Sequence, residues 1–240
     1  MIVEVCANSL ESALIAEKAG ASRIELCSEL AVGGITPSLG LLQKVRDKVR
    51  IPVHVLIRPR SGDFTYSEAE FEIMCLDLLR CADMGFEGVV AGVLAEDHGL
   101  DLKRTRELLS LKGKLHFTFH RAFDWLPEPG EAFGQLEEMG VQTVLSSGQQ
   151  SSALDGLPLL RKLNRLSKSC EVMPGGGIRA ENAAVFKKEG FRALHLSGAG
   201  LAKKGTPLPA ISMNSKELLS DNKRLLSQES VIRSVVESVK

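Results

Sequence analysis

The sequence predicts an α/β protein, a single-domain (β/α)8 barrel of the TIM type. Short β-rich segments alternate with longer segments of helical periodicity along the chain. Eight such units fit into 240 residues, close to the ~250 that this barrel usually takes. An open doubly wound sheet is the main alternative. Its glycine-rich turn normally follows the first strand, whereas here the glycines gather after the last two expected strands.

The elements follow from this alternation. Strands are expected at residues 2–6, 23–27, 53–58, 88–92, 115–120, 143–146, 171–173 and 193–197. Helices are expected near 9–19, 38–49, 67–84, 101–111, 129–139, 152–168 and 180–188. Ser67 with Glu70 fits a capping box at the start of the third helix.

The barrel is expected to occupy residues 1–200. Residues 201–222 break the periodicity and predict an exposed loop. Residues 228–240 predict a last amphipathic helix, because valines and an isoleucine recur at helical spacing from Val231 to Val239. Residues 201–240 would therefore complete the same domain rather than form another.

Composition excludes several classes of protein. Thirty basic residues balance thirty acidic ones, so a nucleic-acid-binding surface is not expected. No apolar run approaches the ~18 residues that a membrane span requires. The first residues carry no basic region typical of a signal peptide. Five cysteines without a CxxC pair indicate reduced thiols, and together these features predict a cytoplasmic protein without nucleic-acid or membrane partners.

Polar residues occupy one face of several expected strands. Side chains two apart in a strand share a face, and the apolar set should pack against the outer helices. This places a charged and histidine-rich set inside the barrel: Glu4, Glu25, Arg58, His116 and His120. Buried charges need partners. The set therefore predicts either a ligand pocket with acid and base groups or an ionic core in which these groups satisfy one another.

Cys6 and Cys27 hold the same position at the ends of neighbouring expected strands, each in a Glu-X-Cys sequence. Adjacent strands lie ~4.8 Å apart, so two inward thiols could bridge one soft ion. Thiolates favour Cu(I) over harder ions. The alternative is that both are small buried apolar residues.

Glycines follow the last two expected strands. Gly175, Gly176 and Gly177 come after the seventh, and Gly198 follows the eighth. TIM barrels often bind a phosphate with the backbone amides of these two loops. The alternative is that the glycines only allow tight turns.

Two further loops carry candidate ligand-binding groups. Arg58 and Arg60, with Asp63 nearby, suit a clamp on carboxylate or phosphate, or else a rigid loop held by Arg–Asp pairing. His120 follows the fifth expected strand and is a candidate general acid or base.

Six segments together resemble the CutC copper homeostasis family, whose members are (β/α)8 barrels. They are EVC at 4–6, RIELCS at 23–28, GGITPS at 33–38, IRPRSGDF at 57–64, FHRAFD at 119–124 and MPGGGI at 173–178. The resemblance covers about residues 1–200. It implies a cytosolic protein linked to copper tolerance, with Cu(I) bound by thiols that map onto Cys6 and Cys27. It also implies a homodimer or larger homo-oligomer.

Two hypotheses compete with plain copper binding. One is a TIM-barrel lyase, isomerase or hydrolase acting on a small phosphorylated or carboxylated metabolite. Its catalytic groups would be His120, Glu25 and Arg58, and its anion would lie on Gly175, Gly176, Gly177, Gly198 and Arg60. The other is an inert scaffold whose interior charges form an ionic core.

Overall fold

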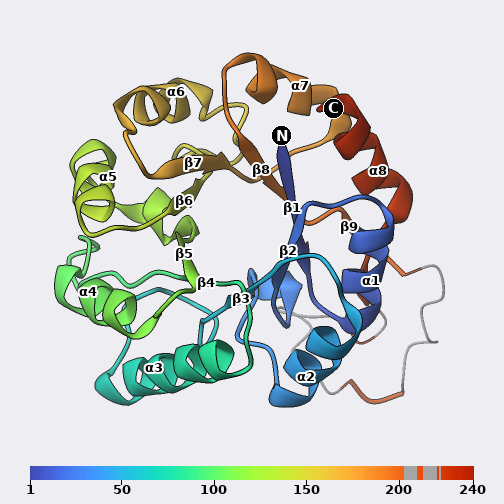
Figure 1. Ribbon diagram of the computed structural model, residues 1–240, viewed down its shortest axis with the longest axis horizontal. Coiled ribbons are helices and arrows are strands. Elements are labelled where there is room, and N and C mark those ends of the chain that lie inside the picture. Colours follow the sequence, from blue (N-terminus) through green and yellow to red (C-terminus); the bar gives the residue numbers. More distant parts are fainter. Residues whose placement is uncertain (203–209, 213–220, 222) are drawn as a thin grey trace.

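Eight parallel strands surround a common axis, and helices cover the outside of the ring (Figure 1). The computed structural model describes residues 1–202, 210–212, 221 and 223–240. The strands pair in the order β7-β6-β5-β4-β3-β2-β1-β8, and a bridge from Gly175 to His195 nearly closes the ring. The predicted fold class is confirmed. The strands are β1 (Ile2–Ala7), β2 (Arg23–Leu26), β3 (Val53–Leu56), β4 (Gly88–Ala91), β5 (His116–Phe119), β6 (Thr143–Ser146), β7 (Glu171–Pro174) and β8 (Ala193–Leu196).

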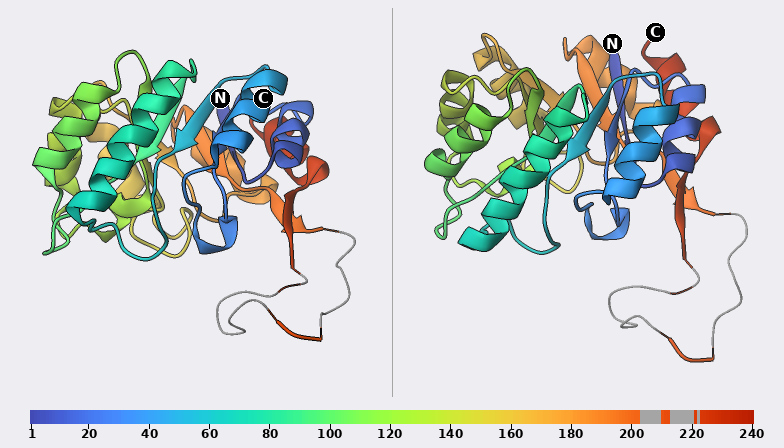
Figure 2. Two further views of the ribbon diagram at one scale, coloured as in Figure 1. Left: turned by 90° about the horizontal axis from the view of Figure 1, so that it is seen from below. Right: turned by 60° about the horizontal axis from the view of Figure 1, so that its bottom comes forward.

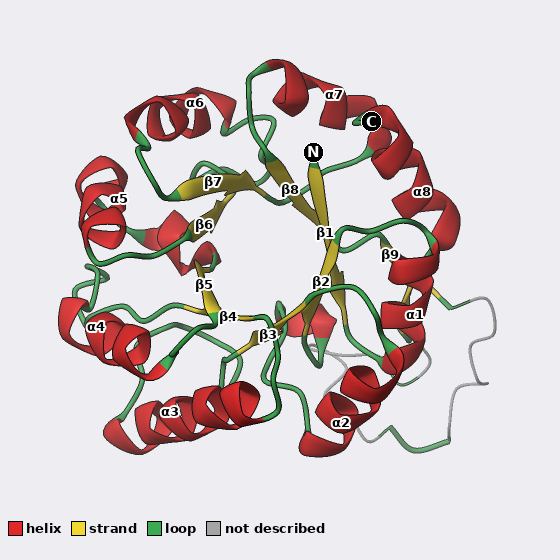
Figure 3. Ribbon diagram, viewed as in Figure 1, coloured by secondary structure: helices red, strands yellow, loops and turns green. Residues whose placement is uncertain are grey.

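A helix follows each of the first seven strands, and Figure 3 shows these helices as the outer layer. The capping box expected at Ser67 and Glu70 is present, with the Glu70 N–H donating to Ser67 Oγ at 3.2 Å. The helices are α1 (Leu10–Lys18), α2 (Leu39–Lys48), α3 (Glu68–Asp83), α4 (Leu102–Leu111), α5 (Pro129–Glu138), α6 (Leu157–Leu166) and α7 (Ala180–Lys188).

The helix expected over 152–168 is shorter in the structure. Residues before Leu157 form a turn in which the Asp155 N–H donates to Ser152 Oγ at 3.2 Å, so α6 begins only after Gly156. Two short 3-10 helices, η1 (Leu30–Val32) and η2 (Arg121–Trp125), were not expected from the sequence. Segments of this length have no periodicity to detect.

The apolar strand residues face the helices, as predicted. Val5, Ile24 and Phe117 are fully buried in the layer between strands and helices. The polar set lies inside the ring, where Glu4 contacts Arg23 of the next strand and Glu25 lines a cavity. The barrel interior is therefore unusually polar, because branched aliphatic residues normally fill it.

The C-terminal segment adds an unexpected hairpin and a helix. β9 (Ala199–Leu201) pairs antiparallel with β10 (Leu225–Ser227), and both project from the end of the barrel away from the chain termini (Figure 2). α8 (Glu229–Ser238) packs on α7 and α1, with Ile232 and Val235 fully buried. Most of the loop expected over 201–222 lies outside the described residues.

In the part of the chain that the structure describes, no helix combines the length and the apolar character needed to cross a bilayer.

Candidate functional site

A cavity of about 1020 Å³ opens where the barrel strands end. Its wall combines residues from the ends of β1, β2, β6 and β8 with the loops that follow β2, β3, β5, β7 and β8. Active sites of TIM barrels form at this end, because the loops after the strands converge there. Among the residues predicted from the sequence, those that line the cavity are Cys6, Glu25, Arg58, His120, Gly176, Gly177 and Gly198.

The two predicted thiols lie together at the base of the cavity. Cys6 Sγ and Cys27 Sγ are 3.5 Å apart, and both are free. Cys6 lines the cavity, whereas Cys27 is fully buried behind it and packs with Leu56 and Val90. The hydrogen bond with Cys27, together with burial, raises the pKa of the Cys6 thiol well above its ordinary value. Both sulfurs are close enough to contact one ion.

Cys6, Glu25 and His195 form a cluster of three potential metal ligands. One ligand atom from each lies within 4.8 Å of the other two. The Cys6 thiol donates to Glu25 Oε1 at 3.5 Å, and His195 Nδ1 lies 4.0 Å from Glu25 Oε2. His195 was not selected as a site residue from the sequence, although its position near the end of an expected strand is a signal that could have found it.

An ion network lies beneath this cluster. Arg23 Nε donates to Glu4 Oε2, and His195 Nδ1 lies 2.8 Å from Glu4 Oε1. Burial by itself would raise the pKa of Glu4, but Arg23 and His195 outweigh it and hold that pKa well below the usual range. This part of the interior is the ionic core considered above. It also orients His195, because Glu4 holds Nδ1 of a ring that lines the cavity.

Glu25 differs from Glu4, because its second oxygen has only the distant ion-pair contact with His195. Oε2 is buried without a hydrogen bond from any described residue. Burial raises the pKa of Glu25 by more than the neighbouring His195 lowers it. This carboxyl can therefore hold a proton closer to neutral pH than an exposed one.

His120 presents a hydrogen-bond donor to the cavity. Its Nδ1 accepts from the Ala122 N–H at 3.2 Å, which places the ring proton on Nε2. That Nε2 is buried and finds no acceptor among the described side chains and backbone. Burial and the charge of Arg58 lower the pKa of His120 to about 3. The ring is therefore neutral near neutral pH and is a poor base.

Arg58 lies in the cavity wall and is 5 % exposed. Its guanidinium donates to backbone oxygens of both neighbouring loops, at 2.8 Å to Val32, 2.9 Å to Gly34 and 2.7 Å to Gly62. It also stacks over Phe64, 5.0 Å from the ring centroid. These three hydrogen bonds fix the loops on either side, and the guanidinium also lies next to the buried Tyr66 hydroxyl.

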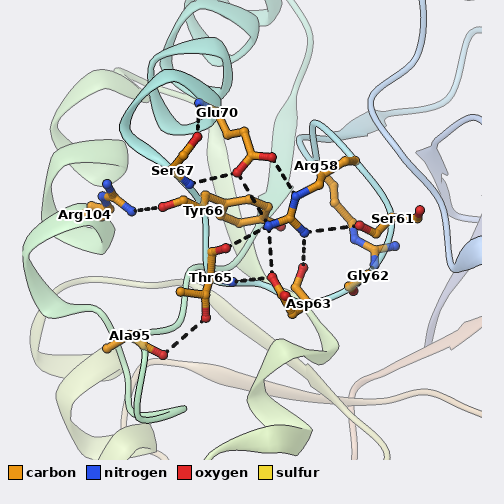
Figure 4. A network of polar contacts seen from close by, with 11 residues as sticks. Arg58, Ser61, Gly62, Asp63, Thr65, Tyr66, Ser67, Glu70, Ala95 and Arg104 are labelled. Carbon is orange, nitrogen blue, oxygen red and sulfur yellow. Dashed lines mark hydrogen bonds and ion pairs between the residues drawn. The ribbon is translucent and has the colours of Figure 1, made fainter.

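The structure does not bring Arg60 to the cavity. Its guanidinium pairs with Glu70 at 2.6 Å and Asp63 at 3.0 Å and donates to the Thr65 carbonyl at 2.8 Å. Figure 4 shows these partners gathered around the loop before α3. This is the alternative that the sequence left open, a rigid loop held by Arg–Asp pairing.

The glycines of the loops after β7 and β8 contribute unequally to the cavity wall. Gly176 and Gly177 adopt φ of 104° and 71° and expose the start of α7 to the cavity. The N–H groups of Gly177 and Ile178 donate to no acceptor within the described residues. Gly175 is not part of the cavity wall, since a Cβ there would lie 2.5 Å from a Leu145 methyl. Gly198 lies against Ile232 of α8 and lines the opposite side.

Comparison with known proteins agrees with this architecture. The model of the CutC family matches residues 1–200. The chain belongs to the CutC family. A CutC family protein of Serratia proteamaculans is 48 % identical over 195 residues, which is 81 % of this chain and 77 % of that protein. A CutC family protein of Sodalis glossinidius is 50 % identical over 195 residues, again 81 % of this chain and 77 % of that protein.

A solved CutC-family structure has the same fold. It is the putative copper homeostasis protein CutC from Streptococcus agalactiae, with a TM-score of 0.78 and 32 % identity. The match covers 82 % of this chain and 98 % of that one. The CutC family model covers Cys6, Cys27, Glu25, His120 and His195, whereas Val231 and Ser234 of α8, which also line the cavity, lie beyond it.

Proposed function

We propose that this CutC-family chain takes part in copper homeostasis and binds Cu(I) through Cys6 and Cys27. The separation of 3.5 Å between the two sulfurs carries the proposal. With metal–sulfur bonds of ~2.3 Å, two ligating sulfurs lie at most ~4.6 Å apart, so an opening of ~1 Å allows linear two-thiolate ligation. Copper would enter through the cavity and meet Cys6 first, because Cys27 is fully buried.

The surroundings of the thiols support an exchangeable site. Both thiols must lose a proton when Cu(I) binds, and Glu25 Oε1 lies next to the Cys6 proton. His195 is near enough to act as a third ligand. Free thiols also fit a cytoplasmic location, and the family resemblance favours a homo-oligomer.

Titration of reduced protein with Cu(I) against a chromophoric chelator tests this proposal. One Cu(I) should bind wild-type protein, and the Cys6→Ser/Cys27→Ser double variant should lose it. Cys75→Ser is the matched control, because that thiol lies on α3 outside the cavity. Equal affinity in wild type and the double variant would exclude the site.

A second function is favoured by the unpaired oxygen of Glu25, which lies in a cavity beside a histidine held by a carboxylate. We propose that Glu25 and His195 move protons on a small anionic metabolite, in a lyase, isomerase or hydrolase. His120 would donate to one of its oxygens, and Arg58 would hold the loops around it.

Solvent deuterium exchange tests this second function. Incubation in D2O with 2-oxo acids and sugar phosphates should label one of them, as followed by proton NMR. Glu25→Gln should abolish labelling, whereas the exposed Glu72→Gln on α3 should not change it. If no compound is labelled faster than in buffer, the acid–base role is wrong.

A further inference from the structure

Unpaired hydrogen-bond donors lie in the wall of the cavity, together with one unpaired carboxylate oxygen, Glu25 Oε2. The buried side-chain donor without a hydrogen-bond partner in this part of the described chain is His120 Nε2, on a residue that is 6 % exposed. The N–H groups of Gly177, which is exposed, and of Ile178, which is buried, are two further donors at the same wall. A buried donor without an acceptor is costly, and a ligand rich in oxygen would satisfy all of them.

The start of α7 strengthens the preference for an anion. This nine-residue helix directs its first N–H groups toward the cavity, where its partial positive charge adds to the loop amides. Arg179 precedes the helix, lines the cavity and is exposed, and its guanidinium pairs with no described carboxylate. Glu181, in the first turn of the helix, is also exposed at the rim. The anion is therefore placed on the loop side, between Gly177 and Arg179.

Aromatic side chains form another part of the wall. Phe64 and Trp125 pack edge to face with ring centroids 4.9 Å apart, and both line the cavity. Trp125, the single tryptophan of the chain, is 48 % exposed. Phe64 is held in place by Arg58 and by His120, whose ring centroid lies 4.8 Å away. An exposed indole on a fixed ring provides a surface for another planar ring.

We propose that this cavity binds a small phosphate monoester that carries a planar ring. The phosphate lies at Gly177, Ile178 and Arg179, and the ring packs against Trp125. His120 Nε2 donates to an oxygen of the ligand. This ligand class narrows the substrate of the second proposed function. Turnover of the ligand rests on that function, whereas binding of the ligand does not. Neither thiol takes part.

Fluorescence of the lone Trp125 tests the proposal in the full chain. Titration with phenyl phosphate should change the emission saturably, and inorganic phosphate should compete. Phosphorus NMR line broadening provides a second readout. Arg179→Gln should weaken binding about tenfold by removing one charge-assisted contact. His120→Phe should also weaken it, because it keeps a ring but removes the donor. Arg80→Gln, on exposed α3 surface, should leave affinity unchanged.

Three results would overturn the site. Phenyl phosphate could give no saturable change at millimolar concentration, phenol could bind as tightly as phenyl phosphate, or Arg179→Gln could bind like wild type. Circular dichroism verifies that each variant is folded. The Cys6→Ser/Cys27→Ser variant separates this site from the copper proposal, because it should retain phenyl phosphate binding while losing Cu(I). If phenyl phosphate binds but no phosphate ester exchanges deuterium, the binding site stands and only the proposed catalytic role is wrong.

Discussion

Glu4 and Arg23 show how single residues hold the polar interior together. Both are buried, and each supplies the main charge partner of the other. A buried ion pair balances desolvation against attraction, so losing one partner leaves a charge in a low-dielectric site. The interior below the cavity therefore depends on both residues, although neither is a candidate ligand.

Removal of one partner should be costly. We expect Arg23→Met to lower the free energy of unfolding by ~3–5 kcal/mol, because Glu4 stays buried without its guanidinium. The double variant Glu4→Gln/Arg23→Met should cost less than the sum of the two single changes. Urea denaturation measures all three, and strictly additive effects would show that the pair is not coupled.

His54 makes stability depend on pH. Burial lowers its pKa to about 3, whereas the unfolded chain has the ordinary value of 6.5. Between these values the unfolded state binds the extra proton, so the free energy of unfolding rises with pH in that window, by at most ~1.4 kcal/mol per pH unit for one histidine. His54→Gln should flatten the slope between pH 4 and 6.5, whereas the exposed His98→Gln should not. If wild type, His54→Gln and His98→Gln all show the same slope, His54 is not the source of the pH dependence.

At the scale of elements, β4 makes room for the histidine rings. A Cβ on Gly88 would lie 2.5 Å from the His54 ring, and one on Gly92 would lie 2.6 Å from His120 Nδ1. The His54 ring stacks on the His116 ring, with centroids 4.9 Å apart, and is held in place by it. The histidine rings of β3 and β5 therefore fit inside the barrel only because the neighbouring residues of β4 are small.

Two glycine substitutions should act in opposite directions. Gly88→Ala should cost ~1–3 kcal/mol, because the added methyl meets the fixed His54 ring. Gly134→Ala, within α5 and with open space at the Cβ position, should stabilise by ~0.5–1 kcal/mol, because it restricts the unfolded chain. Thermal denaturation of both variants is the measurement. The packing argument fails if Gly88→Ala melts at the wild-type temperature.

At the scale of the whole molecule, α8 joins the end of the chain to the barrel. Ile232 is fully buried and lies against Gly198, next to the cavity rim. α8 also packs on α1, which ties the last residues to the first β/α unit. The helix thus supports the rim formed by the loop after β8.

Shortening Ile232 should destabilise the whole barrel. We expect Ile232→Ala to cost ~2–5 kcal/mol, since the cavity left behind lies between rigid elements. Val231→Ala, at a position 37 % exposed, is the matched control and should cost much less. Urea denaturation compares the two, and a small equal effect would mean that α8 adds little to the stability of the domain.

The sequence by itself determined the order and type of the elements. β-branched runs, helical periodicity and capping residues such as Ser67 act within a few residues, so they can be read without knowing the partners. The inward position of Glu4, Glu25 and His120 also followed, because alternation along a strand is local. The nearness of Cys6 and Cys27 followed from parallel neighbouring strands.

Tertiary structure alone decided which of these groups meet at the cavity and which do not. His195 contacts Glu4 across 191 residues of chain, because β8 closes against β1, and no local pattern encodes that register. Arg58 and Arg60 are two residues apart, yet one lies in the cavity wall and the other pairs with Glu70. Their directions depend on loop conformation beyond the strand, where alternation no longer holds and competing partners decide.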